Sequence, residues 1–105
     1  MALDRLPDLD PADGEVLDAE LAYSADVLVK AFAFGPHSEL PAHAHEGSTN
    51  TFHVVEGELV VVSDDAEERV TAPGVVVHDP GAMHGARNET DERAVLTATF
   101  SPPPG

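Results

Sequence analysis

The chain has 105 residues, which suits one compact domain and leaves no room for two. Asp and Glu number 20 against 5 Lys and Arg, and the net charge of −15 argues against binding to nucleic acid or to an anionic membrane surface, because both would repel it. Cysteine is absent, which excludes disulfides, thiolate metal sites and thiol nucleophiles.

The predicted elements begin with an N-terminal arm over residues 1–15. It mixes Pro, Asp and Gly without a periodic pattern of apolar residues, and we expect it to have no chemical role. Short segments rich in Val, Ala, Leu and Phe follow, and turn-forming Gly, Pro, Asn and Asp residues separate them. These segments are predicted β-strands: residues 25–34, 51–55, 59–62, 75–78 and 94–100. Residues 101–105 form a tail whose prolines cannot continue a strand ladder, because proline lacks the N–H group.

No segment long and amphipathic enough for a helix remains. Many short strands at close spacing predict an all-β protein, a small antiparallel barrel or sandwich, because closing or stacking the sheets removes exposed edges. No apolar run approaches the roughly 20 residues of a membrane helix, and the N-terminus lacks the pattern of a secretory signal. We therefore expect a cytoplasmic protein.

The acidic residues are spread along the whole chain, and Lys30 is the only lysine. This balance resembles that of proteins from salt-loving archaea. In molar salt the Debye length is only about 3 Å, so the self-repulsion of such a surface is screened. We expect a halophilic source, with an ordinary acidic cytosolic protein as the alternative.

Histidines gather in the stretch between Pro41 and Glu58. His43 and His45 are two positions apart, so on a β-strand both rings would point to the same face. Such a pair can offer two nitrogen ligands to one metal ion. A third histidine, His53, follows eight residues later.

Two motifs contain these and other histidines. The first consists of Gly35, Pro41, His43, His45, Asn50 and Gly57, and the second of Gly74, Pro80, Gly81, His84 and Asn88. Together they span residues 35–88 and resemble the two motifs of the cupin superfamily. The chain is thus similar to a small single-domain cupin of the cupin 2, conserved-barrel type. The resemblance implies one domain over residues 1–105, folded as a double-stranded β-helix or cupin jelly roll.

The resemblance also implies a divalent transition metal, Fe, Mn, Ni or Zn, at a point where barrel closure brings His43, His45 and His84 together. The position that usually holds a metal-binding glutamate is occupied by Asn50, which offers only a neutral amide oxygen. The ion would keep more of its charge, act as a stronger Lewis acid, and favour an anionic, chelating substrate. The alternative is a metal-free barrel in which water and backbone groups satisfy the imidazoles.

The remaining histidines are assigned by their neighbours. On an unbroken strand from Asn50, His53 points away from the barrel interior, and only a bulge would make it a further metal ligand. His37, in a Gly-Pro turn, is expected to be a solvated loop side chain. His78 lies next to Asp79, and such an imidazole–carboxylate pair is as often a structural or supporting contact as a catalytic one.

The sequence therefore predicts a small metal-binding cupin that acts on or binds a small polar, carboxylated ligand. The reaction stays open between a metal-dependent isomerase or lyase, as in the similar cupins that isomerise unsaturated uronates, and a dioxygenase. Catalytic residues are not assigned. The alternative is a non-catalytic sensor or binding cupin, with or without metal. The resemblance also implies a homodimer, because single cupins often pair and thereby cover the edge strands of their sheets.

Overall fold

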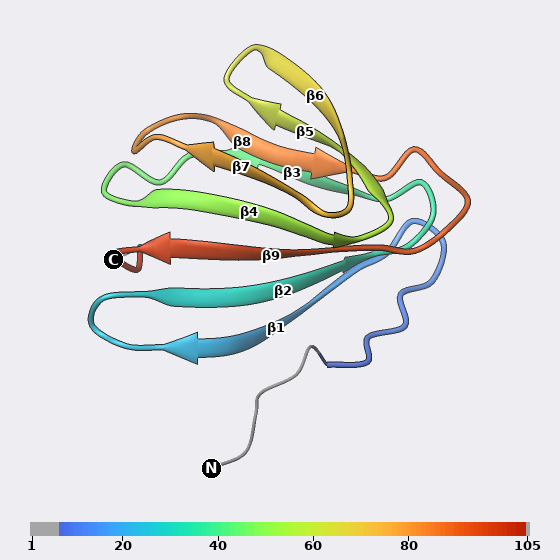
Figure 1. The fold of residues 1–105 in the computed structure, drawn as a ribbon, viewed down its shortest axis with the longest axis horizontal. Helices are drawn as coiled ribbons and strands as arrows, with labels where there is room; N and C mark the ends of the chain where they lie inside the picture. Colours follow the sequence, from blue (N-terminus) through green and yellow to red (C-terminus); the bar gives the residue numbers. More distant parts are fainter. Residues whose placement is uncertain (1–6, 105) are drawn as a thin grey trace.

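The computed structural model describes residues 7–104, which form nine β-strands (Figure 1). In chain order they are β1 (Val16–Tyr23), β2 (Leu28–Phe34), β3 (Glu39–His43), β4 (Thr49–Glu56), β5 (Glu58–Ser63), β6 (Ala66–Thr71), β7 (Gly74–His78), β8 (His84–Arg87) and β9 (Ala94–Ser101). Every pairing between them is antiparallel. The prediction of an all-β fold is confirmed. The described residues include no helix that could cross a membrane.

The strands form two sheets that face each other (Figure 1). The five-stranded sheet has the order β1-β2-β9-β4-β7, and the four-stranded sheet has the order β3-β8-β5-β6. Apart from the hairpins β1–β2 and β5–β6, the chain crosses to the other sheet after each strand. This is the jelly-roll arrangement that the two motifs predict.

The five predicted strand segments correspond to β2, β4, β5, β7 and β9. The other four strands, β1, β3, β6 and β8, were not predicted, and three of them lack a clear apolar pattern. In β6 only Val70 is buried, β8 has only four residues, and β3 contains Pro41 where its register with β8 is irregular. Such polar, short or proline-containing strands are typical of sheet edges and of strands that carry a site.

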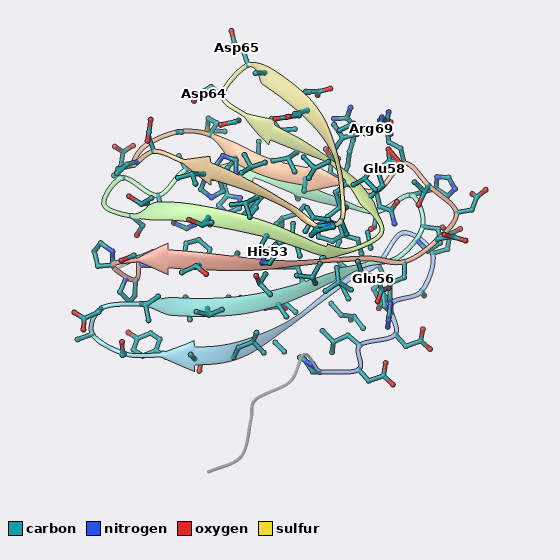
Figure 2. All side chains as sticks on the ribbon, in the orientation of Figure 1. His53, Glu56, Glu58, Asp64, Asp65 and Arg69 are labelled. Carbon is teal, nitrogen blue, oxygen red and sulfur yellow. The ribbon has the colours of Figure 1, made fainter. Side chains whose placement is uncertain are left out.

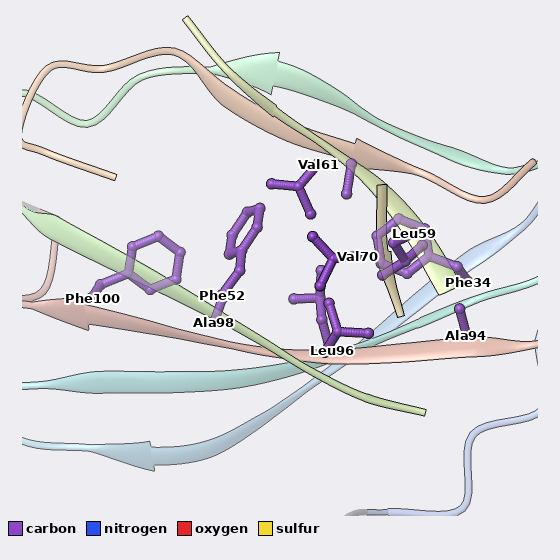
Figure 3. Packing of buried hydrophobic residues seen from close by; sticks show 11 residues of the cluster. Phe34, Phe52, Leu59, Val61, Val70, Ala94, Leu96, Ala98 and Phe100 are labelled. Atoms are coloured by element: carbon purple, nitrogen blue, oxygen red, sulfur yellow. The ribbon is translucent and has the colours of Figure 1, made fainter. Parts of the chain in front are cut away.

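The hydrophobic core lies between the two sheets (Figure 3). On β4 the inward side chains of Phe52 and Val54 are buried and His53 between them is exposed, as the period of two requires. The core cluster consists of Phe34, Phe52, Val54, Leu59, Val61, Val70, Ala86, Ala94, Leu96, Ala98 and Phe100. Asn50 continues the inward row of β4 and is a polar residue with only 1% of its surface exposed.

The described part of the N-terminal arm is held in place by hydrogen bonds. Arg93 Nη1 donates to the carbonyl oxygen of Leu9 at 2.6 Å, and the N–H of Gly35 donates to the carbonyl oxygen of Glu15 at 2.8 Å. A Cβ at Gly35 would lie 1.9 Å from the carbonyl oxygen of Ala12, so this approach requires glycine. Residues 1–6 of the predicted arm lie outside the described residues.

Asn88, the last residue of the second motif, has a structural role. Its buried amide nitrogen donates to the carbonyl oxygens of Phe34, Gly35 and Glu92 at 3.3, 3.1 and 2.7 Å. Its Oδ1 accepts hydrogen bonds from the N–H and the hydroxyl of Thr90. These bonds tie the end of β8 to the end of β2 and thereby fix the strand that begins with His84.

Candidate metal centre

Three histidines of the two motifs lie close together. His43 is the last residue of β3, His45 lies in the turn that follows, and His84 is the first residue of β8. Each offers one ring nitrogen, and these three atoms all lie within 4.8 Å of one another. The ring centroids are 4.6 to 5.3 Å apart. A single ion can therefore reach all three rings, although β3 ends at His43 and does not carry both histidines as the sequence predicted.

Backbone geometry brings His43 beside His84. The two residues are direct partners in the β3–β8 ladder, after a register irregularity that begins at Leu40. Gly85 permits this close approach, because a Cβ there would lie 2.7 Å from the carbonyl oxygen of Leu40 and 2.9 Å from Cα of Ala42. A side chain at Gly85 would push β3 away and separate the two imidazoles.

Hydrogen bonds fix which ring nitrogen is free in two of the imidazoles. Nδ1 of His43 lies 3.0 Å from the carbonyl oxygen of Pro41, and Nδ1 of His84 lies 3.1 Å from that of Ala82. A carbonyl oxygen only accepts, so Nδ1 carries the proton in both rings and Nε2 keeps its lone pair. Nε2 of His84 is buried without a hydrogen-bond partner. This donor set fits a transition metal ion, which binds imidazole lone pairs oriented by such outer contacts.

The electrostatics also keep two of the imidazoles, those of His84 and His45, neutral. Burial lowers the pKa of His84 to about 4, the bond to Ala82 opposes this shift, and the nearby His43, His78 and His45 reinforce it. Burial is also the main cause that lowers the pKa of His45, with a smaller contribution from His43. Neutral imidazole is the form that ligates a metal ion, so both rings are ready to bind at neutral pH.

Asn50 lies on β4, next to a residue that contacts this group. It is the register partner of Phe100 on β9, and the Phe100 ring is 5.2 Å from the ring of His45. Both amide atoms of Asn50, Oδ1 and Nδ2, are buried without a hydrogen-bond partner. The side chain predicted to stand in the place of a glutamate ligand is therefore buried in the barrel interior, and its ladder partners Phe100 and His78 have rings close to those of His45 and His84.

The structure does not bring His53 to the group. The ladders of β4 with β7 and β9 run without a shift from Asn50 to Val54, so no bulge turns His53 inward. Its side chain is exposed on the face of the sheet away from the core (Figure 2). The suggestion that His53 completes the metal site is thus corrected, and the reason is the regular alternation of the strand.

The two other histidines have different environments. His37 is exposed and its Nε2 lies 2.8 Å from Asp91, as expected for a loop side chain. His78 is fully buried, and its Nδ1 lies 3.0 Å from Oγ of Ser63 rather than near Asp79, so the pair with Asp79 is not formed. Its ring is 5.1 Å from that of His84. Sequence reasoning missed Ser63, because only the packing of β5 against β7 places it there.

The comparison with protein families agrees with this geometry. The family model described as a cupin domain matches residues 31–100, well over half of the chain. The chain is a cupin. No curated protein matches it.

Solved structures similar to this cupin cover most of its length. A protein from Thermus thermophilus is 28% identical with a TM-score of 0.80, and the match covers 84% of each chain. An RmlC-like cupin from Desulfovibrio desulfuricans is 27% identical with a TM-score of 0.84, covering 98% of each chain. A predicted oxalate decarboxylase from Thermotoga maritima shares the fold, with 23% identity, a TM-score of 0.80, and coverage of 86% of this chain and 83% of that one.

A pocket opens beside one of the three histidines of this cupin. It has a volume of about 430 Å³ and lies between the turn from Ala44 to Ser48, which includes His45, and the prolines from Pro102 to Pro104. Oγ of Ser48 donates to the carbonyl oxygen of Pro102 at 2.6 Å and holds the two walls together. The volume is in the range of small-molecule sites.

The described cationic side chains of this cupin are all engaged with carboxylates. Lys30 pairs with Asp18 at 2.6 Å, and the arginines pair with glutamates at 2.7 to 3.3 Å. The arginines are Arg69, Arg87 and Arg93. Among residues 7–104, therefore, no unengaged lysine or arginine is available to attract an anionic ligand.

The free energy of unfolding of the metal-free cupin is expected to fall between about pH 6.5 and pH 4. The unfolded chain protonates His84 below about pH 6.5, whereas the folded chain does so only near the lowered pKa of about 4. The unfolded state binds more protons across this window, so stability decreases as the pH falls. The pKa difference corresponds to about 3 kcal/mol. Urea unfolding at about pH 7 and about pH 4.5 measures it, and equal stabilities would contradict a buried neutral His84.

Proposed function

We propose that His43, His45 and His84 bind a divalent transition metal ion, Fe, Mn, Ni or Zn, and that this ion holds a small polar, carboxylated ligand. The observation that carries the proposal is the buried Nε2 of His84, which has a lone pair and no protein partner and lies within reach of two further imidazole nitrogens. A buried acceptor without a partner is costly unless something binds it. A metal ion meets that need.

The preference for a carboxylated ligand follows from the charges. The described cationic side chains are already paired with carboxylates, so the bound ion supplies the only positive charge in the interior described by the structure. Its three ligands are neutral, so the ion keeps its full charge toward a carboxylate. One similar structure is described as a predicted oxalate decarboxylase, and oxalate is a small carboxylate.

The chain's own residues hold, orient and shield the site. His43 and His84 are oriented by the carbonyl oxygens of Pro41 and Ala82, and the pocket beside His45 provides room for a ligand. When bound, the ion would polarise a carbonyl group or lower the pKa of a bound water. The described histidine group contains no carboxylate, although Glu46 lines the pocket beside His45, and no side chain is assigned as a general acid or base. Ligand binding without turnover is therefore the second candidate function.

Calorimetric titration with oxalate tests this proposal on the metal-free protein and on the protein loaded with Zn²⁺. Binding to the loaded protein is expected to be at least about tenfold tighter, because only the ion offers a positive charge to the carboxylate. The matched neutral probe is oxamide, which should show a much smaller difference between the two forms. Equal oxalate affinities with and without the ion would contradict the proposed mode of binding.

A further inference from the structure

Two polar side chains beside the three histidines have buried atoms that no protein group satisfies. They are Asn50, through both Oδ1 and Nδ2, and His78, through Nε2. Their exposed fractions are 1% and 0%. Unsatisfied buried polar groups are rare in folded proteins, and each one needs a physical explanation.

The strand register places these two side chains next to each other. Asn50 on β4 and His78 on β7 are direct partners in the ladder, so both point into the barrel from neighbouring strands. The His78 ring is 5.1 Å from that of His84. On its other side, Asn50 is paired with Phe100, whose ring contacts His45. The amide therefore lies between residues that contact two of the three metal-binding histidines.

Counting donors and acceptors suggests how these atoms are used. If Nδ1–H of His78 donates to Oγ of Ser63, which lies 3.0 Å away, its Nε2 keeps a lone pair. That lone pair can accept a hydrogen bond from Nδ2 of Asn50. The remaining unsatisfied atom is then Oδ1 of Asn50, a neutral oxygen that a divalent ion can bind.

We infer that Ser63, His78 and Asn50 form a hydrogen-bonded chain that turns Oδ1 of Asn50 toward the ion held by the three histidines. His78 and Ser63 are then positioning residues. Asn50 and His78 are not hydrogen-bonded to each other in the structure, and in the proposed chain their bond forms when the ion binds. The opposite arrangement, with Nε2–H of His78 donating to Oδ1, would turn the amide N–H groups toward the cation and is disfavoured by repulsion.

This inference rests on the proposed metal site, and Zn²⁺ affinity measured by competition with a chelator tests it. His78→Phe removes the acceptor and is expected to weaken Zn²⁺ binding about tenfold, as loss of an outer partner does. Asn50→Ala should weaken it to a similar extent. If His78 acts through Asn50, the double variant should bind Zn²⁺ as Asn50→Ala does, without a further loss. His78→Gln, which restores an acceptor, should recover most of the affinity.

The matched control is His53→Phe. It makes the same change of histidine to phenylalanine on β4, on the face opposite Asn50, and should leave Zn²⁺ affinity unchanged. A second readout needs no variant. Nitrogen NMR of the Zn²⁺-loaded wild-type protein should show His78 protonated at Nδ1 and unprotonated at Nε2. Protonation at Nε2, or additive losses from His78→Phe and Asn50→Ala, would overturn the inference while the metal site stands. Failure of the wild-type protein to bind Zn²⁺ would overturn the metal site and this inference together.

Discussion

Replacement of His84 by alanine is expected to weaken metal binding by more than about a hundredfold. His84 is 2% exposed and supplies a buried lone pair on Nε2, so no water can easily replace it as a ligand. Loss of a direct ligand should cost more than the roughly 10- to 100-fold that follows loss of an outer partner. Titration of His84→Ala with Zn²⁺, in competition with a chelator, measures the change.

Two controls separate ligation from folding. His53→Ala removes an exposed histidine of the same protein and should leave Zn²⁺ affinity within about twofold of wild type, because exposed surface substitutions have small effects. His84→Gln keeps a side chain of similar size and polarity in the buried position. If His84→Gln folds and binds Zn²⁺ as tightly as wild type, His84 is not a metal ligand.

The second large effect is expected from Asn50→Glu. This substitution places an anionic oxygen beside three neutral imidazoles, so affinity for Mn²⁺ or Fe²⁺ should rise by roughly tenfold or more. The carboxylate also lowers the net charge on the ion and fills one of its open positions. Oxalate affinity of the metal-loaded protein should therefore fall although the metal is held more tightly. Paired titrations with metal and then with oxalate measure both changes.

The metal-free form of Asn50→Glu provides an independent check. Asn50 is 1% exposed, so a carboxylate there is buried without a counter-charge when no ion is bound. The melting temperature of the metal-free variant should be lower than that of wild type and should recover when metal is added. A variant whose metal affinities and melting temperature both equal those of wild type would show that residue 50 does not face the ion.

The sequence predicted the strands with a clear apolar pattern and missed most of those that are short or polar. β4 and β9 have alternating or continuous apolar residues because both face the core. β6 and β8 were missed because β6 buries only one side chain and β8 has four residues. A strand stabilised by its neighbours needs no apolar pattern of its own.

The part of the candidate site formed by the three histidines could be predicted from the spacing of the two motifs. The three histidines come from two sequence motifs, and the period of a strand correctly turned His53 away from them. The environment of His78 was not predictable, because Ser63 lies 15 residues away in the chain and meets His78 only through packing between the sheets. The halophilic source, the cytoplasmic location and the homodimer stay predictions.

The central claim is that this cupin binds one divalent ion through His43, His45 and His84. The most direct measurement is a calorimetric titration of the chelator-treated wild-type protein with Zn²⁺ at about pH 7.5, where free imidazole is neutral. The account predicts one ion bound per chain with a dissociation constant of about 1 μM or lower. Absence of binding at millimolar Zn²⁺, or binding that survives substitution of all three histidines, would contradict it.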